Sequence, residues 1–182
     1  MLGCLRTLLI ASMALAASTA AAIDPIRIGV SGPFTGGSSP MGIAMRDGIR
    51  LAAQEINDEG GILGRPLQLV ERDDEARPER GALVVQELIN REKVVAGLGI
   101  VNTGVALASQ RFYQQARIPM ITSVATGSVV TKQFLPPQYP DNYIFRVSAP
   151  DIVQAAMIIE EAVVRRQFRK LAILHEDRKS TR

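Results

Sequence analysis

The sequence predicts an α/β domain built around a doubly wound parallel sheet. Short runs rich in β-branched residues alternate with segments of helical periodicity, and this alternation is typical of βαβ units. The strand-like runs are almost continuously apolar, as expected for strands that helices cover on both faces. With 47% apolar residues, the 182-residue chain is large enough to form one hydrophobic core.

The predicted elements follow one another in a regular order. We expect strands at 26–31, 67–71, 94–100, 119–123, 143–147 and 170–174. Helices are expected from about 41 to the Gly60-Gly61 stop, and at 78–90, 105–116 and 151–166, while the Pro-rich stretch 136–140 reads as an irregular connection. The last helix has an apolar face made of Ile152, Ala155, Ile159, Ala162 and Val163.

The first 22 residues are predicted to be a cleavable signal peptide. Met1 and Arg6 supply its positive groups, residues 7–17 form its apolar region, and Ala20 and Ala22 stand in A-x-A register. The apolar region is well short of the roughly 20 residues that a membrane-spanning helix needs. Cys4 is the one cysteine and lies inside this segment, so we expect an exported chain without disulfides or thiolate metal sites.

Uncharged polar residues follow the predicted strands, where ligands of open α/β folds usually bind. They are Ser38, Ser39, Asn102, Thr103, Thr122, Ser123, Thr126 and Ser128. Thr103 and Gly104 also begin a predicted helix, whose unpaired amides and positive end favour an anion such as a carboxylate. Ser, Thr and Asn are also the ordinary N-caps of helices, so the polar residues of each loop can be either helix caps or ligand-binding residues.

Signatures of catalysis and of nucleotide binding are incomplete. The run that begins at Gly97 has Asn102 where a dinucleotide fingerprint has its third glycine, and Val105 stands where a P-loop has its lysine. His175 is the only histidine, so we interpret it as part of a solvated strand end, because metal sites need three or four convergent ligands. Asp73 and Asp74 are interpreted as a loop and helix-entry pair. The net charge of +3 is spread along the chain, which argues against nucleic-acid binding.

The order and spacing of many residues resemble a known family. The matching residues are Ile28-Gly29-Val30-Ser31-Gly32-Pro33-Phe34-Thr35-Gly36, Gly48, Ala52, Glu55-Ile56-Asn57, Gly60-Gly61-Ile62, Gly64, Asp73-Asp74, Gly97 to Gly104, Ile118-Pro119-Met120-Ile121, Ala125-Thr126 and Phe145-Arg146. Over residues 26–176 the chain is similar to type I periplasmic solute-binding proteins, and more closely to the leucine/isoleucine/valine-binding branch that feeds ABC importers.

This resemblance implies a set of ligand-binding residues. Thr103, with nearby backbone amides such as that of Gly104, matches the group that holds the α-carboxylate of the solute. The Val124 carbonyl and the Thr126 hydroxyl, with Ala125 between them, match the contacts to the carboxylate and the α-ammonium. Met41 matches a pocket position where relatives often have an aromatic residue. Because of this difference, the resemblance does not identify the side chain of the solute.

The resemblance also implies two lobes that close around the solute. We expect a signal peptide at 1–22, an N-terminal lobe at 23–148 that lacks its returning C-terminal segment, and the beginning of a second lobe at 149–182. The chain is accordingly expected to be truncated. Because sites normally bury about 70–90% of a ligand, one lobe alone should bind a solute weakly or not at all.

The implied function is that of a non-enzymatic, monomeric, periplasmic carrier. It would bind branched-chain amino acids or related small carboxylates or amides without a cofactor or metal, and deliver them to the membrane permease of an ABC importer. A periplasmic ligand sensor of the same fold is the alternative. An α/β enzyme with its catalytic groups in a missing half is less favoured, because residues 26–176 offer hydroxyls without a partner base.

Overall fold

The computed structural model describes residues 24–172, so the predicted signal peptide at 1–22 lies outside the described residues, as do Cys4 and His175. The strands are β1 (Ile26–Gly32), β2 (Leu67–Asp73), β3 (Ala96–Gly99), β4 (Met120–Thr122) and β5 (Ile144–Arg146). The helices are α2 (Ser39–Asp58), α3 (Pro78–Asn90), α4 (Thr103–Ala116), α5 (Asp151–Ile159) and the π-helical turn η1 (Glu160–Arg165). Except at the C-terminal end, every predicted element is present, with ends that shift by a few residues.

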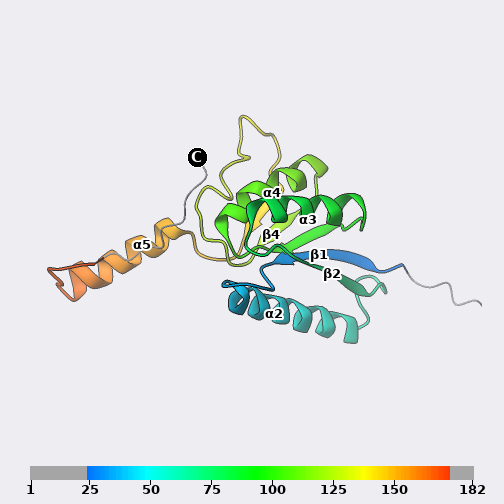
Figure 1. Ribbon diagram of the computed structural model, residues 1–182, viewed down its shortest axis with the longest axis horizontal. Coiled ribbons are helices and arrows are strands. Elements are labelled where there is room, and N and C mark those ends of the chain that lie inside the picture. The colour runs from blue at the N-terminus through cyan, green and yellow to red at the C-terminus, as the bar shows by residue number, and fades with distance from the viewer. Residues whose placement is uncertain (1–23, 173–182) are drawn as a thin grey trace, which may run out of the picture.

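The five strands form one parallel sheet in the order β2-β1-β3-β4-β5. Helix α2 lies on one face of this sheet, and α3 and α4 lie on the other (Figure 1). The chain leaves β1 in one direction to form β2 and then crosses back to form β3, so the winding direction reverses between β1 and β3. The prediction of a doubly wound α/β lobe is confirmed.

The face covered by α3 and α4 contains most of the core. Along one row of paired residues, Gly97 packs against the ring of Tyr113, and Met120 and Ile144 are 1% and 2% exposed. Tyr113, which comes from α4, is itself 1% exposed. Close packing of this kind is the principal source of stability in a cysteine-free domain.

The opposite face is only partly covered, because α2 packs against β1 and β2. The neighbouring row on β3, β4 and β5 consists of Leu98, Ile121 and Phe145, which pair with one another in register. Leu98 and Ile121 are half-buried, and Phe145 is 49% exposed. Side chains alternate between the faces of a strand, so this exposed row lies one residue away from the core row.

The C-terminal helix differs from its prediction. A single helix at 151–166 was expected, whereas α5 passes into η1 at Glu160 and extends away from the sheet (Figure 1). The apolar face of α5 and η1 is not buried: Ile152 is 64% exposed and Ile159 is 51% exposed. The strand prediction at 170–174 is wrong for residues 170–172, which pair with no strand of the described chain, and residues 173–174 lie outside it.

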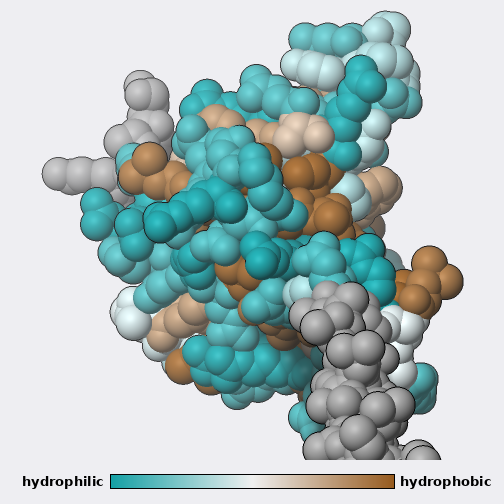
Figure 2. All heavy atoms as spheres, turned by 90° about the vertical axis from the view of Figure 1, so that its right-hand side faces the viewer, coloured by the Kyte–Doolittle hydropathy of each residue, from teal (hydrophilic) through white to brown (hydrophobic). Residues whose placement is uncertain are grey.

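The amino edge of the sheet is largely hydrophilic (Figure 2). Arg27 donates to the carbonyl of Glu92 at 3.2 Å, and Arg65 donates to the carbonyl of Asp24 at 2.8 Å. Among the described residues 24–172, no helix has the length and apolarity required to cross a membrane. The uncharged polar residues noted in the sequence lie at or after the ends of β1, β3 and β4, and so at the other, carboxyl edge.

Candidate functional site

The carboxyl ends of the parallel strands meet at one edge of the sheet, beside the reversal between β1 and β3. Loops of residues 33–38, 100–102, 123–128 and 147–150 leave the strands there. Ligands of open α/β sheets bind in this position because the loops diverge around a crevice. This carboxyl edge is the candidate functional site.

Thr103 begins α4, with Asn102 as an N-cap that makes no side-chain capping bond. The Thr103 hydroxyl oxygen accepts a hydrogen bond from the Gly127 amide at 3.2 Å. A hydroxyl can donate one hydrogen bond while it accepts others, so the Thr103 proton is available to an acceptor. The exposed Gly104 follows in the first helical turn, where backbone amides have no intrahelical partner. This helix start can bind an anion.

The loop of residues 123–128 lies against the start of α4. Ala125 is 1% exposed, its amide donates to the carbonyl of Ile100 and its carbonyl accepts from the Ser148 hydroxyl, both at 3.3 Å, so this predicted site residue belongs to the core. Val124 and Thr126 on either side of it are half-buried. At Gly127 a methyl group would overlap the side chain of Thr103, so the absence of a side chain at Gly127 allows this loop to lie directly against the start of α4.

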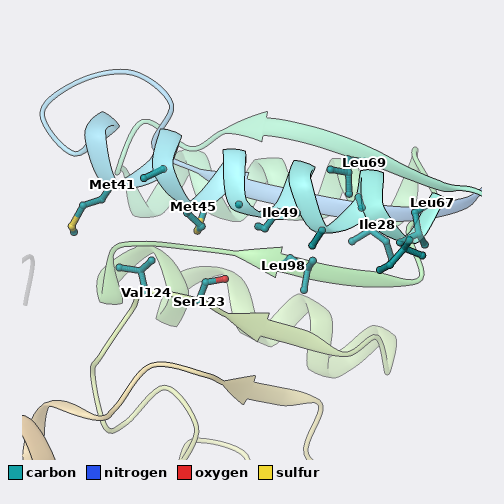
Figure 3. A pocket seen from close by; sticks show the side chains of 14 residues that line it. Ile28, Met41, Met45, Ile49, Leu67, Leu69, Leu98, Ser123 and Val124 are labelled. Atoms are coloured by element: carbon teal, nitrogen blue, oxygen red, sulfur yellow. The ribbon is translucent and has the colours of Figure 1, made fainter. Parts of the chain in front are cut away.

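An apolar groove of about 560 Å³ runs along α2 and ends at the carboxyl edge (Figure 3). Met41 and Val124 line the end of the groove near the strand carboxyl ends, while Leu67 and Ile28 line the other end. Ser123 is the only polar residue among those that line it. Met41 is 50% exposed in the first turn of α2, which leaves it free to contact an apolar group.

The six residues predicted to bind a ligand thus fall into two connected groups. Thr103 and Gly104 begin α4, and Ala125 and Thr126 lie on the loop that the bond between Gly127 and Thr103 joins to it. Met41 shares the groove with Val124. A weak hydrogen bond from Asn102 to the Ser38 hydroxyl, at 3.4 Å, connects the first loop to the start of α4. Thr122 is fully buried and donates to the carbonyl of Ile100, so it has a structural role.

Two charged residues at this edge were missed when the expected site was described as uncharged. Arg146 donates to the carbonyls of Thr126 and Gly127 at 3.2 and 2.8 Å. The Asp151 carboxylate accepts hydrogen bonds from the amide and the hydroxyl of Ser128. These bonds, and that from the Ile152 amide, lower the pKa of Asp151 against a smaller opposing effect of desolvation. The available signal was their position at the end of the last predicted strand of the lobe, for Arg146, and shortly after that strand, for Asp151.

The adjacent carboxylates Asp73 and Asp74 have different environments. Their interpretation as a loop and helix-entry pair is wrong, because β2 extends two residues beyond its predicted end: Asp73 is the last residue of this strand, Asp74 lies in the loop that follows, and the N-cap of α3 is Arg77. Burial opposes ionisation of Asp73, but hydrogen bonds from the Thr35 hydroxyl and from the amides of Glu75 and Phe34 outweigh it and lower its pKa. Burial raises the pKa of Asp74 to about 6, and repulsion from Asp73 and Glu75 adds to this effect. One Asp74 oxygen accepts from the Ala76 amide, and the other has no partner within residues 24–172.

Metal ligands do not converge anywhere in residues 24–172: no three His, Cys, Asp or Glu side chains lie close enough together to hold an ion. The carboxyl edge instead offers a hydroxyl, helix amides, backbone carbonyls and an apolar groove. Such a combination suits a small molecule with a carboxylate and an apolar part.

Comparison with known proteins identifies the family of the chain. A protein family described as "Periplasmic binding protein" matches residues 25–182. An "Amino acid binding protein" of Pseudomonas aeruginosa is 30% identical over 155 residues, which cover 85% of this chain and 40% of the relative. The chain therefore spans less than half the length of this curated relative.

Solved structures give the same result for the fold. The branched-chain amino acid transporter substrate-binding protein LivJ of Streptococcus pneumoniae, in complex with isoleucine, superposes with a TM-score of 0.70 at 28% identity, over 77% of this chain and 38% of that one. A solute-binding protein of an ABC transporter from Rhodopseudomonas palustris, in complex with 3,4-dihydroxybenzoic acid, has a TM-score of 0.66 at 29% identity, over 78% and 36%.

Proposed function

The chain belongs to the periplasmic binding protein family, and from this premise we propose that it is the substrate-binding component of an ABC importer for amino acids or related small carboxylates. The proposed protein is non-enzymatic, works in the periplasm as a monomer, and passes its solute to a membrane permease. Similarity to an amino-acid-binding protein and to solved complexes with isoleucine and with an aromatic acid supports this class of solute.

The observation that carries the proposal is the geometry of Thr103. Its oxygen already accepts the Gly127 amide, so its proton is left to donate to an anion at the start of α4. The first amides of α4 and the positive end of the helix favour the same charge, with a contribution of about 0.3–2 kcal/mol. A carboxylate bound here would lie at the carboxyl edge, beside the end of the groove.

The remaining contacts follow from the same placement. We propose that the Val124 carbonyl and the Thr126 hydroxyl bind the α-ammonium group of an amino acid. The side chain of the solute would lie toward Met41, where the groove presents apolar surface. Solutes with aliphatic or aromatic side chains are compatible with that surface, because it contributes area rather than directed hydrogen bonds.

The residues proposed to contact the solute belong to the lobe proposed at 23–148, with 149–182 as the beginning of a second lobe. Met41 and Gly104 are exposed, so a solute on this edge keeps much of its surface in water. Tight sites bury about 70–90% of a ligand. The 182-residue chain should therefore bind its solute weakly, in the range of about 1 mM or weaker, which corresponds to about 4 kcal/mol of binding free energy at most.

Nuclear magnetic resonance is suited to binding of this strength. We would titrate the ¹⁵N-labelled chain with leucine and 3,4-dihydroxybenzoate up to about 10 mM. The expected result is a saturable shift of the amides of Thr103, Gly104 and residues 125–128. Leucinamide keeps the side chain and the ammonium group of leucine but has no carboxylate, so it should shift these amides much less. Failure of both carboxylates to shift them would contradict the proposal.

A further inference from the structure

The Phe145-Arg146 pair is part of the family resemblance, yet nothing in the proposed solute contacts uses Arg146. Arg146 is half-buried at the end of β5, and its guanidinium donates to carbonyls of the loop of residues 123–128. We propose that Arg146 is a positioning residue for solute binding, which holds this loop in the shape that makes Thr103 a hydrogen-bond donor. The solute-binding part of this inference rests on the function proposed above.

Two successive peptide groups of the loop are held at both ends. In the first, the Thr126 carbonyl accepts from Arg146 at 3.2 Å and the Gly127 amide donates to Thr103 at 3.2 Å. In the second, the Gly127 carbonyl accepts from Arg146 at 2.8 Å and the Ser128 amide donates to Asp151 at 3.2 Å. The C=O and N–H of a trans peptide point in opposite directions. Because Arg146 holds the carbonyls of Thr126 and Gly127 on one side of the loop, the amides of Gly127 and Ser128 point to the other side.

The consequence for Thr103 is a defined hydrogen-bonding role. A free hydroxyl rotates and can accept from the α-ammonium or donate to the α-carboxylate of a solute. With the Gly127 amide on one lone pair, rotation of the hydroxyl is restricted, and its proton points away from Gly127 and can be donated to an acceptor. The loop held by Arg146 thereby favours a carboxylate at the start of α4, even though Arg146 itself makes no proposed contact with the solute.

The same cluster connects the loop to the segment that leads into α5. The Thr126 carbonyl accepts the Asp151 amide at 2.9 Å in addition to Arg146, and the Ser148 hydroxyl donates to the Ala125 carbonyl at 3.3 Å. The charge of Arg146 also favours the ionised Asp151 carboxylate, whose pKa is lowered mainly by the Ser128 hydroxyl. A neutral side chain at position 146 would remove the one cation that satisfies both loop carbonyls.

Amide hydrogen exchange, measured without a solute, tests whether Arg146 holds the loop of residues 123–128 in place. We compare the 182-residue chain with Arg146→Met, Arg146→Lys and Arg91→Met, where Arg91 is an exposed arginine after α3. Loss of a charge-assisted hydrogen bond predicts exchange at Gly127 and Ser128 that is faster by about tenfold or more in Arg146→Met. Arg146→Lys keeps the charge and should show a smaller increase, and Arg91→Met should match the wild-type chain.

The exchange of Leu98, in the centre of the sheet, separates positioning from general destabilisation. The proposal predicts that Leu98 changes much less than Gly127 and Ser128. An equal acceleration at all three amides, or unchanged exchange at Gly127 and Ser128, would overturn it. Because Arg146→Lys is the milder change, it keeps the test valid if Arg146→Met fails to fold.

Leucine titration then tests the consequence for binding. Arg146→Met should raise the dissociation constant by about tenfold, with a smaller rise for Arg146→Lys and none for Arg91→Met. Full affinity in Arg146→Met, despite faster exchange at Gly127, would contradict the positioning role. Absence of leucine binding by the wild-type chain would instead contradict the proposed function, and the exchange result would still decide whether Arg146 holds the loop.

Discussion

The two faces of the sheet differ in how completely helices cover them. On the α3 and α4 face, Met120 and Ile144 are almost completely buried and Tyr113 covers Gly97. On the α2 face, the adjacent row ends with Phe145 at 49% exposure, and an open apolar groove runs beside the helix. The first face is closely packed and should contribute most of the stability of the lobe. The second face leaves an apolar groove open, and the candidate site lies at one end of that groove.

The largest expected effect comes from two neighbouring residues of β5. Ile144→Ala should destabilise the chain by about 2–5 kcal/mol, because it opens a cavity in the covered core. Phe145→Ala removes a larger side chain from the exposed row, yet should cost about 1 kcal/mol or less. Urea unfolding of both variants measures this difference. Equal losses would show that the two faces are equally important for stability.

The stability of the fold should depend on pH through Asp74, the buried residue that directly follows β2. Its pKa is raised to about 6 by burial, so the neutral carboxyl favours the folded state. This contribution is complete below pH about 4 and is lost as pH rises through about 6, a change of up to about 3 kcal/mol.

Asp74→Asn is the matched variant, since an amide cannot ionise over this range. Relative to Asp74→Asn, the wild-type chain should lose stability as the pH rises from about 4, the pKa in the unfolded chain, through about 6, the pKa in the folded chain. Urea unfolding at several pH values measures the difference. A difference that stays constant with pH would refute the raised pKa.

Two glycines on opposite faces give smaller effects of opposite sign. Gly97→Ala places a methyl group against the ring of Tyr113 and should destabilise by about 1–3 kcal/mol. Gly48→Ala, on α2 beside the groove, meets nothing within 4 Å and should stabilise by about 0.5–1 kcal/mol through helix propensity. Thermal unfolding compares them, and a destabilising Gly48→Ala would mean that the groove is more tightly packed than the lobe structure indicates.

The elements of the fold were predictable because each has a local cause. Helical periodicity and the Pro78 start define α3 with the predicted bounds, and the apolar runs identify the strands. Residues 151–165 show where this reasoning stops, since their apolar face predicted burial and is exposed. Periodicity identifies a helix but does not specify the surface against which the helix packs.

The candidate site was predictable only in part, for a related reason. Thr103 and Thr126 follow from the rule that parallel strands end at one edge. The contacts of Arg146 depend on how β5 pairs with β4 after the long irregular connection between them, and no local pattern encodes that register. The burial of Ala125 and the bond between Gly127 and Thr103 arise from the same tertiary packing.

The claim that the carboxyl edge binds a carboxylate through Thr103 is tested most directly by removing its hydroxyl. Thr103→Val keeps the shape of the side chain but can neither accept from Gly127 nor donate to a solute. In a leucine titration followed by the amides of Gly104 and Thr126, we expect saturable shifts for the wild-type chain and a dissociation constant about tenfold higher or more for the variant. Equal affinity of the two chains for leucine would contradict this assignment of the site.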